Sequence, residues 1–296
     1  MRYEAHETLV APARSSSEPV RLMAGLSLTL LLFFLFTYVF SFVLGAFVAP
    51  PAREGFNETL EVGTTPVSVL INLYLFILIV VALGIAVRQV HARSLASLVG
   101  PIPRAMAQFR RVCLYLLGLH LAISVLVPSP PGLVPQLHLA PVIWLAYLPL
   151  ALPAVLIQTS AEELVFRGYL QSQLAAYFKK PLIWLLVPSV LFGLLHHDSL
   201  MQGDNAWLVV GWAVAFGVAA ADLTARSGTL GPAIALHFMN NVVAILLAAP
   251  QDNFDGLALF TFPFGLDDAS ALWAWAPVDL MTLFCGWLTA RLALRR

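Results

Sequence analysis

The stretch Gln-Thr-Ser-Ala-Glu-Glu-Leu-Val-Phe-Arg-Gly-Tyr-Leu-Gln, residues 158–171, places two adjacent carboxylates and an arginine inside an apolar region. The run before it, residues 140–157, holds no acidic or basic side chain. Even on the mildest scales, one ionised side chain near the centre of a bilayer costs about 2.5–3.5 kcal/mol. The three charges therefore indicate either a functional site or a charged helix end at the membrane surface.

On a helix, two of these three charged side chains can pair with each other, and the third is left without a partner. Glu163 and Arg167 are four residues apart, so on a helix they share a face and can form an ion pair. Glu162 is rotated by about 100° from Glu163 and has no such partner in its own helix. A carboxylate left over in this way suits a general base near neutral pH.

The composition excludes a soluble protein. Hydrophobic residues make up 60% of the 296 residues and charged residues only 11%, whereas soluble domains carry about 25% charged residues. We expect an all-α, polytopic helical bundle in the lipid bilayer, in the plasma membrane if the source is prokaryotic. The net charge of zero gives no sign of a nucleic-acid partner. The two cysteines, Cys113 and Cys285, form neither a metal motif nor a disulfide framework.

Eight apolar segments are candidates for spanning helices, which need about 20 residues each. The fourth is expected to continue past its carboxylates, because residues 164–178 contain no proline and a single glycine. The third and the fifth are the shortest. The candidate spans are residues 22–48, 66–87, 112–128, 140–160, 181–197, 206–223, 229–249 and 271–290.

The charges of the connecting segments predict the orientation. With the N-terminus in the cytoplasm, every Lys and Arg except Arg53 falls on the cytoplasmic side. By the positive-inside rule, this distribution favours eight spans with both termini cytoplasmic. The outer loops carry acidic residues instead, namely Glu54, Glu58, Glu61, Asp252, Asp255, Asp267 and Asp268.

A second polar set, Phe192 and His196, lies four residues apart near the end of the fifth segment. From the basic turn at residues 179–180, the chain runs about 17 residues back to Glu162 and about 16 forward to His196. At 1.5 Å per residue, these two side chains are expected at the same height across a helical hairpin. A carboxylate beside an imidazole can hold and activate a water molecule. The alternative is a structural histidine at a helix end.

A third polar set, His237 and Asn241, shares one face of the seventh segment, whereas Asn240 is expected to point elsewhere. A histidine and an amide side by side can donate two hydrogen bonds to a developing oxyanion. The alternative is a pair of interhelical hydrogen bonds, worth about 0.6 kcal/mol each in a membrane.

The three motifs E-E-x-x-x-R, F-x-x-x-H and H-x-x-x-N, in this order, resemble the CPBP family of CAAX prenyl endopeptidases of the Ras-converting type and bacteriocin-processing or immunity proteins. The resemblance covers about residues 140–250. We accordingly divide the chain into an N-terminal membrane region (1–130), a catalytic membrane domain (131–255) and a last span with its tail (256–296). The matching residues are Glu162, Glu163, Arg167, Phe192, His196, His237 and Asn241.

The resemblance implies an intramembrane endopeptidase whose catalytic cavity opens toward the cytoplasm. It implies that Glu162 and His196 activate water and that His237 and Asn241 bind the oxyanion. The remaining motif residues, Glu163, Arg167 and Phe192, support them. The implied substrate is a membrane-associated protein or peptide, with CAAX-type processing as one form of the reaction.

A bound zinc ion is an alternative, because the family was long described as metalloproteases. Glu162, His196 and His237 would then be its ligands. Arg167 beside Glu163 opposes a dication, however, and the chain has no H-E-x-x-H motif. We therefore expect a metal-free mechanism without a cofactor.

Two other classes of function remain open: a non-catalytic membrane immunity or scaffold protein, and a proton-coupled transporter. A scaffold would not need all three motifs. A transporter should show an internal repeat with interrupted helices in both halves. The N-terminal half of this chain has no counterpart of the three polar sets.

Overall fold

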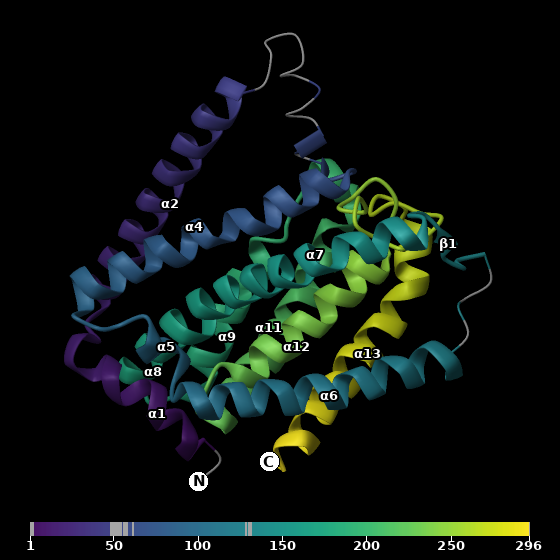
Figure 1. Cartoon of the computed structure of the whole chain (residues 1–296). Helices are drawn as coiled ribbons and strands as arrows, with labels where there is room; N and C mark the ends of the chain where they lie inside the picture. The colour runs from purple at the N-terminus through teal and green to yellow at the C-terminus, as the bar shows by residue number, and fades with distance from the viewer. Residues whose placement is uncertain are drawn as a thin grey trace.

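The structure is a computed structural model that describes residues 3–47, 55, 59–60, 62–127, 129 and 132–295. Most of these residues lie in helices (Figure 1). The elements are η1 (Glu4–His6), α1 (Glu7–Val10), η2 (Ala11–Ser16), α2 (Pro19–Phe47), α4 (Pro66–His91), α5 (Ala96–Val99), α6 (Ile102–Leu126), β1 (Gln136–Leu137), α7 (Pro141–Glu163), η4 (Leu164–Gln171), α8 (Ser172–Tyr177), α9 (Pro181–Leu194), α10 (Ser199–Gln202), η5 (Gly203–Asn205), α11 (Ala206–Ser227), α12 (Gly231–Asn241), η6 (Val242–Leu247), β2 (Ala248–Ala249), β3 (Phe260–Thr261) and α13 (Ala269–Leu294).

Helix α12 lies at the centre of the bundle, where it packs against α6, α7, α11 and α13 (Figure 1). Helices α9 and α11 form a second closely packed pair, whereas α2 packs mainly against α4 at the edge of the molecule. The three short strands pair in the order β1-β3-β2 and tie the segment before α7 to the loop that follows η6. This arrangement brings α7, α9 and α12, which carry the three polar sets, together.

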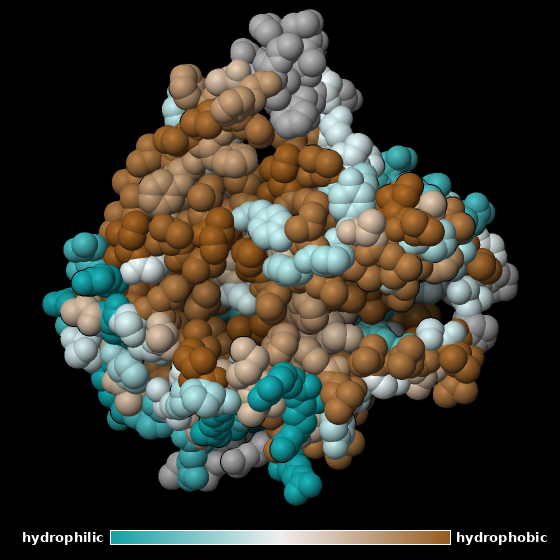
Figure 2. All heavy atoms as spheres, viewed as in Figure 1, coloured by the Kyte–Doolittle hydropathy of each residue, from teal (hydrophilic) through white to brown (hydrophobic). Residues whose placement is uncertain are grey.

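The surface of the bundle confirms a polytopic membrane protein. Figure 2 shows hydrophobic residues over the middle of this face and hydrophilic residues gathered at the end that carries both termini. Many large apolar side chains face outward, among them Phe34, Leu121, Val142 and Phe284. A lipid bilayer is the surrounding that such a surface needs, since soluble proteins rarely expose large contiguous apolar patches.

All eight expected spans contain a helix. Within the described part of the chain, six helices are long and apolar enough to cross a membrane: Pro19–Phe47, Pro66–His91, Ile102–Leu126, Pro141–Tyr177, Ser199–Ser227 and Ala269–Leu294. The other two, Pro181–Leu194 and Gly231–Leu247, are shorter apolar helices. The third span is longer than expected, because its helix begins ten residues earlier and includes the basic residues Arg104, Arg110 and Arg111. Arg53, Glu54, Glu58 and Glu61, expected in the first outer loop, lie outside the described residues.

The fourth span continues past its carboxylates, which confirms the expectation. Helix α7 ends at Glu163 and passes without a break into the π-helix η4 and then α8. A second π-helix, η6, begins directly after Asn241. Short π-helical turns inside α-helices are frequent at functional sites. Both π-helices here begin at a residue that follows one of the expected site residues.

The polar N-terminal segment folds against the bundle, which the sequence did not predict. The Tyr3 hydroxyl donates to Asp222 Oδ1 at 2.8 Å, and the Ser16 hydroxyl lies 2.9 Å from Nδ1 of His91. His6 is buried, and its Nε2 lies 3.4 Å from the Gln171 amide. Burial lowers the pKa of His6 to about 4, so this imidazole is neutral at neutral pH.

The two termini lie at the same end of the bundle, opposite the loop between η6 and α13 (Figure 1). Reporters fused to both termini or inserted at residues 93–101 are therefore expected to label from the same side of the membrane. Reporters inserted at 252–268 should label from the other side. Termini that report from opposite sides would contradict this topology. The division of the chain after residues 130 and 255 stays a prediction.

Candidate active site

The last turn of α7 and the start of η4 position the charged motif. Glu163 is the last residue of α7. The Arg167 guanidinium donates from Nη1 to Glu163 Oε1 at 2.9 Å, and both side chains are fully buried. The predicted ion pair is therefore confirmed. A pair so completely buried has no water to screen it, which makes each partner dependent on the other.

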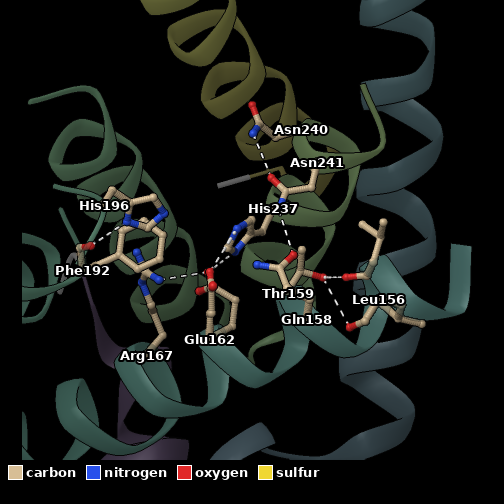
Figure 3. Close-up of polar contacts among 12 residues, drawn as sticks. Leu156, Gln158, Thr159, Glu162, Arg167, Phe192, His196, His237, Asn240 and Asn241 are labelled. Atoms are coloured by element: carbon tan, nitrogen blue, oxygen red, sulfur yellow. Dashed lines mark hydrogen bonds and ion pairs between the residues drawn. The ribbon is translucent and has the colours of Figure 1, made fainter. Parts of the chain in front are cut away.

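His237 of α12 lies between the two carboxylates (Figure 3). Its Nδ1 is 2.8 Å from Glu163 Oε1, and its Nε2 is 3.4 Å from Glu162 Oε2. Because the Glu163 carboxylate accepts hydrogen bonds, Nδ1 of His237 is the protonated nitrogen, and its N–H donates a hydrogen bond to this carboxylate. Glu163 thus accepts hydrogen bonds from both Arg167 and His237, and it fixes the orientation of the His237 imidazole.

Glu162 differs from Glu163 in exposure and in partners. Its side chain is 17% exposed, whereas that of Glu163 is 0% exposed. The expected partner of Glu162 was His196, but the imidazole in contact with it is that of His237. The expectation that Glu162 and His196 share a water molecule does not require direct contact, so it stays a prediction. Glu162 is the more accessible of the two carboxylates.

Phe192 connects the second motif to the first and the third. The Arg167 guanidinium lies over its ring at 4.6 Å, and its centroid is 4.5 Å from that of His196 and 5.9 Å from that of His237. Helix α9 ends at Leu194, so His196 lies in the turn that follows it. There its Nδ1 donates to the Phe192 carbonyl oxygen at 2.8 Å, which leaves Nε2 as the nitrogen with the lone pair.

Asn241 joins the cluster through a residue that the sequence analysis did not select. Its Nδ2 donates to Gln158 Oε1 at 2.8 Å, and its Oδ1 accepts from Asn240 Nδ2 at 3.1 Å (Figure 3). Asn240, which was expected to point elsewhere, thus contacts the side chain of Asn241. Gln158 lies one helical turn before Glu162, and this spacing of four was the available signal.

The site does not have the geometry of a zinc site. Among the residues that the structure describes, no group of three or more His, Cys, Asp or Glu side chains is arranged to hold a metal ion. Both nitrogens of His237 face carboxylates, and one of these, Glu163, is already paired with Arg167. Glu162, His196 and His237, considered above as zinc ligands, do not fit a bound zinc in this arrangement.

The fold and the site together define an integral, multi-pass membrane protein with a buried cluster of carboxylates and imidazoles. Residues 143–243 match the family described as Type II CAAX prenyl endopeptidase Rce1-like. The match confirms the resemblance drawn from the three motifs, all of which lie inside it.

The chain is also similar to a Bacillus subtilis (strain 168) protein described as "Uncharacterized protein YyaK". The two are 27% identical over 210 residues, which cover 66% of this chain and 68% of that protein. No solved structure gives a significant match.

Proposed function

We propose that the protein is an intramembrane endopeptidase that hydrolyses a peptide bond of a membrane-associated protein or peptide, with a glutamate as the general base. The match to a family described as prenyl endopeptidases supports peptide-bond hydrolysis. The observation that carries the proposal is the row of contacts Arg167–Glu163–His237–Glu162, in which one carboxylate is compensated and the other is partly exposed.

Charge balance supports the assignment of roles. When His237 is protonated, the carboxylates of Glu162 and Glu163 face two cations, and the cluster carries no net charge. A balanced cluster is far less costly to bury than one with an unpaired charge. The imidazolium then has an N–H at Nε2, on the side of Glu162. This N–H can donate a hydrogen bond to an oxyanion.

In the proposed reaction, Glu162 takes a proton from a water molecule, and the water oxygen forms a bond to the carbonyl carbon of the substrate. The carbonyl oxygen becomes an oxyanion that accepts hydrogen bonds from His237 Nε2 and Asn241 Nδ2. When the C–N bond breaks, Glu162 passes its proton to the leaving nitrogen. One water molecule is consumed for each bond cleaved, and Glu162 is regenerated as a carboxylate.

His196 is the second group that binds the attacking water. Its Nδ1–H is held by the Phe192 carbonyl oxygen, so Nε2 can accept a hydrogen bond from the attacking water. Phe192 lies against both imidazoles and the Arg167 guanidinium, and it therefore keeps these groups at fixed separations. We propose that Glu163, Arg167 and Phe192 position the reacting groups without contacting the substrate.

The purified protein in liposomes provides the test. Two quenched fluorescent peptides of one sequence are compared, one with a lipid anchor on a cysteine and one without. We expect cleavage of the anchored peptide at the higher rate, because the anchor concentrates it in the bilayer where the site lies. If neither peptide is cleaved, the proposal of an endopeptidase for membrane-associated substrates fails.

The same assay tests the absence of a cofactor. Cleavage is expected to keep its rate after incubation with EDTA or phenanthroline, because none of the proposed steps uses a metal ion. Metal analysis of the purified protein should find no stoichiometric zinc. Activity that is lost on chelation and restored by zinc would show that the metal-free assignment is wrong.

A further inference from the structure

Three amide side chains form a row beside the cluster of carboxylates and imidazoles (Figure 3). Asn240 donates from Nδ2 to Asn241 Oδ1 at 3.1 Å, and Asn241 donates from Nδ2 to Gln158 Oε1 at 2.8 Å. Gln158 is buried, with 7% of its surface exposed, and comes from α7. Asn240 and Asn241 come from the last turn of α12. The row therefore joins the helix of the first motif to the helix of the third.

An amide carries both a donor and an acceptor, so a row of three amides can run in either of two directions. In the observed direction, the NH₂ group of Asn241 faces Gln158. It uses one N–H for Gln158 and keeps the second for another acceptor. In the opposite direction, the oxygen of Asn241 would take the place of this NH₂ group, and the site would lose a donor. The two neighbours of Asn241 decide between these directions.

We propose that Gln158 and Asn240 are positioning residues that hold the Asn241 amide with its NH₂ group toward the reacting carbonyl oxygen. This inference rests on the proposed function, in which Asn241 is an oxyanion donor. Gln158 accepts a hydrogen bond from the NH₂ group of Asn241 and so keeps that group on its side. Asn240 donates a hydrogen bond to Oδ1 of Asn241 and so keeps this oxygen turned away from Gln158. Neither residue needs to contact the substrate.

The position of Gln158 makes the arrangement sensitive to the geometry of α7. Gln158 is one turn before Glu162, so the same helix holds the general base and the residue that orients the oxyanion donor. The π-helix η6 begins at the residue after Asn241, and the backbone there departs from the α-helical repeat. The Asn241 amide is instead held in place by its hydrogen bond to Gln158 of the neighbouring helix α7.

A double-mutant cycle tests the inference with the liposome assay. Gln158→Leu removes the acceptor at similar volume and is expected to lower kcat about 10- to 100-fold with KM nearly unchanged, because the oxyanion contact forms only in the transition state. In an Asn241→Ala background, which alone should cost about 10²–10³ in rate, the same change should have an effect of less than about threefold. A purely structural role of Gln158 would instead lower the rate by the same factor in both backgrounds.

Thr159→Val is the matched control on the next residue. Thr159 is fully buried, and its hydroxyl donates to the Val155 carbonyl oxygen of its own helix at 2.9 Å. Loss of this hydroxyl should leave kcat within about twofold of wild type. Each variant is also followed by thermal unfolding, so that a loss of folded protein is not read as a loss of rate.

Asn240→Asp provides a second test if Gln158→Leu does not fold. A carboxylate only accepts hydrogen bonds, so Asp at position 240 would attract the Asn241 NH₂ group and reverse the row. We expect a loss in kcat close to that of Asn241→Ala. A wild-type kcat in both Gln158→Leu and Asn240→Asp, with a strong loss in Asn241→Ala, would overturn this inference alone. A wild-type rate in Asn241→Ala would overturn the oxyanion role and the inference with it.

Discussion

Glu162→Gln is expected to abolish peptide-bond cleavage and to leave the thermal unfolding temperature near that of wild type. Glutamine keeps the volume and the hydrogen-bonding capacity of the side chain but has no basic carboxylate. Glu162 is the partly exposed member of the pair, and its contact to His237 Nε2 is long at 3.4 Å. Its loss should therefore cost little stability, whereas a reaction without its base should show no measurable turnover.

The measurement combines the cleavage rate in liposomes with thermal unfolding of the same preparations. His196→Ala should behave like Glu162→Gln, because it removes the second group that holds the water. Glu18→Gln is the control for the loss of a carboxylate. Its side chain is 61% exposed and forms a surface ion pair with Arg21, so both rate and stability should stay at wild-type values. A wild-type rate in Glu162→Gln would rule out Glu162 as the general base.

Glu163→Gln is expected to lower stability and activity together. The change leaves the Arg167 guanidinium buried without its counterion and removes the carboxylate that orients His237. Breaking a buried ion pair by removing one partner typically costs about 3–5 kcal/mol. The double variant Glu163→Gln/Arg167→Gln should regain part of this loss, because no unpaired charge then remains in the core.

Unfolding of the three variants in detergent tests this expectation. The Arg167→Gln single variant completes the cycle. The double variant should lose much less stability than the sum of the losses in the two single variants. Activity should not return with stability, since Nδ1 of His237 then faces a neutral amide in place of the carboxylate that stabilises the imidazolium. A double variant less stable than either single variant would contradict the ion pair as the source of the effect.

The contacts between residues close in the sequence were the part of the site that could be predicted. The pair Glu163–Arg167 and the contact between Phe192 and His196 both follow from a separation of four residues. The helical bundle follows from eight long apolar segments. In each case the information lies within a short stretch of the chain, where local geometry fixes which side chains meet.

Contacts between helices could not be predicted in this way. That His237 contacts Glu162 depends on how α12 packs against α7, and no spacing along the chain encodes this. The row of amides from Gln158 to Asn240 was missed for the same reason. The docking of the N-terminal segment through Tyr3 joins residues more than 200 positions apart.

The most direct test of the central claim is a comparison of membrane-protein termini in cells that express wild-type protein or Glu162→Gln at equal levels. The account predicts a set of new termini with the wild-type protein that is absent with Glu162→Gln. The same set in both samples would contradict the glutamate mechanism. No new terminus in either sample would contradict proteolysis and favour a non-catalytic membrane scaffold.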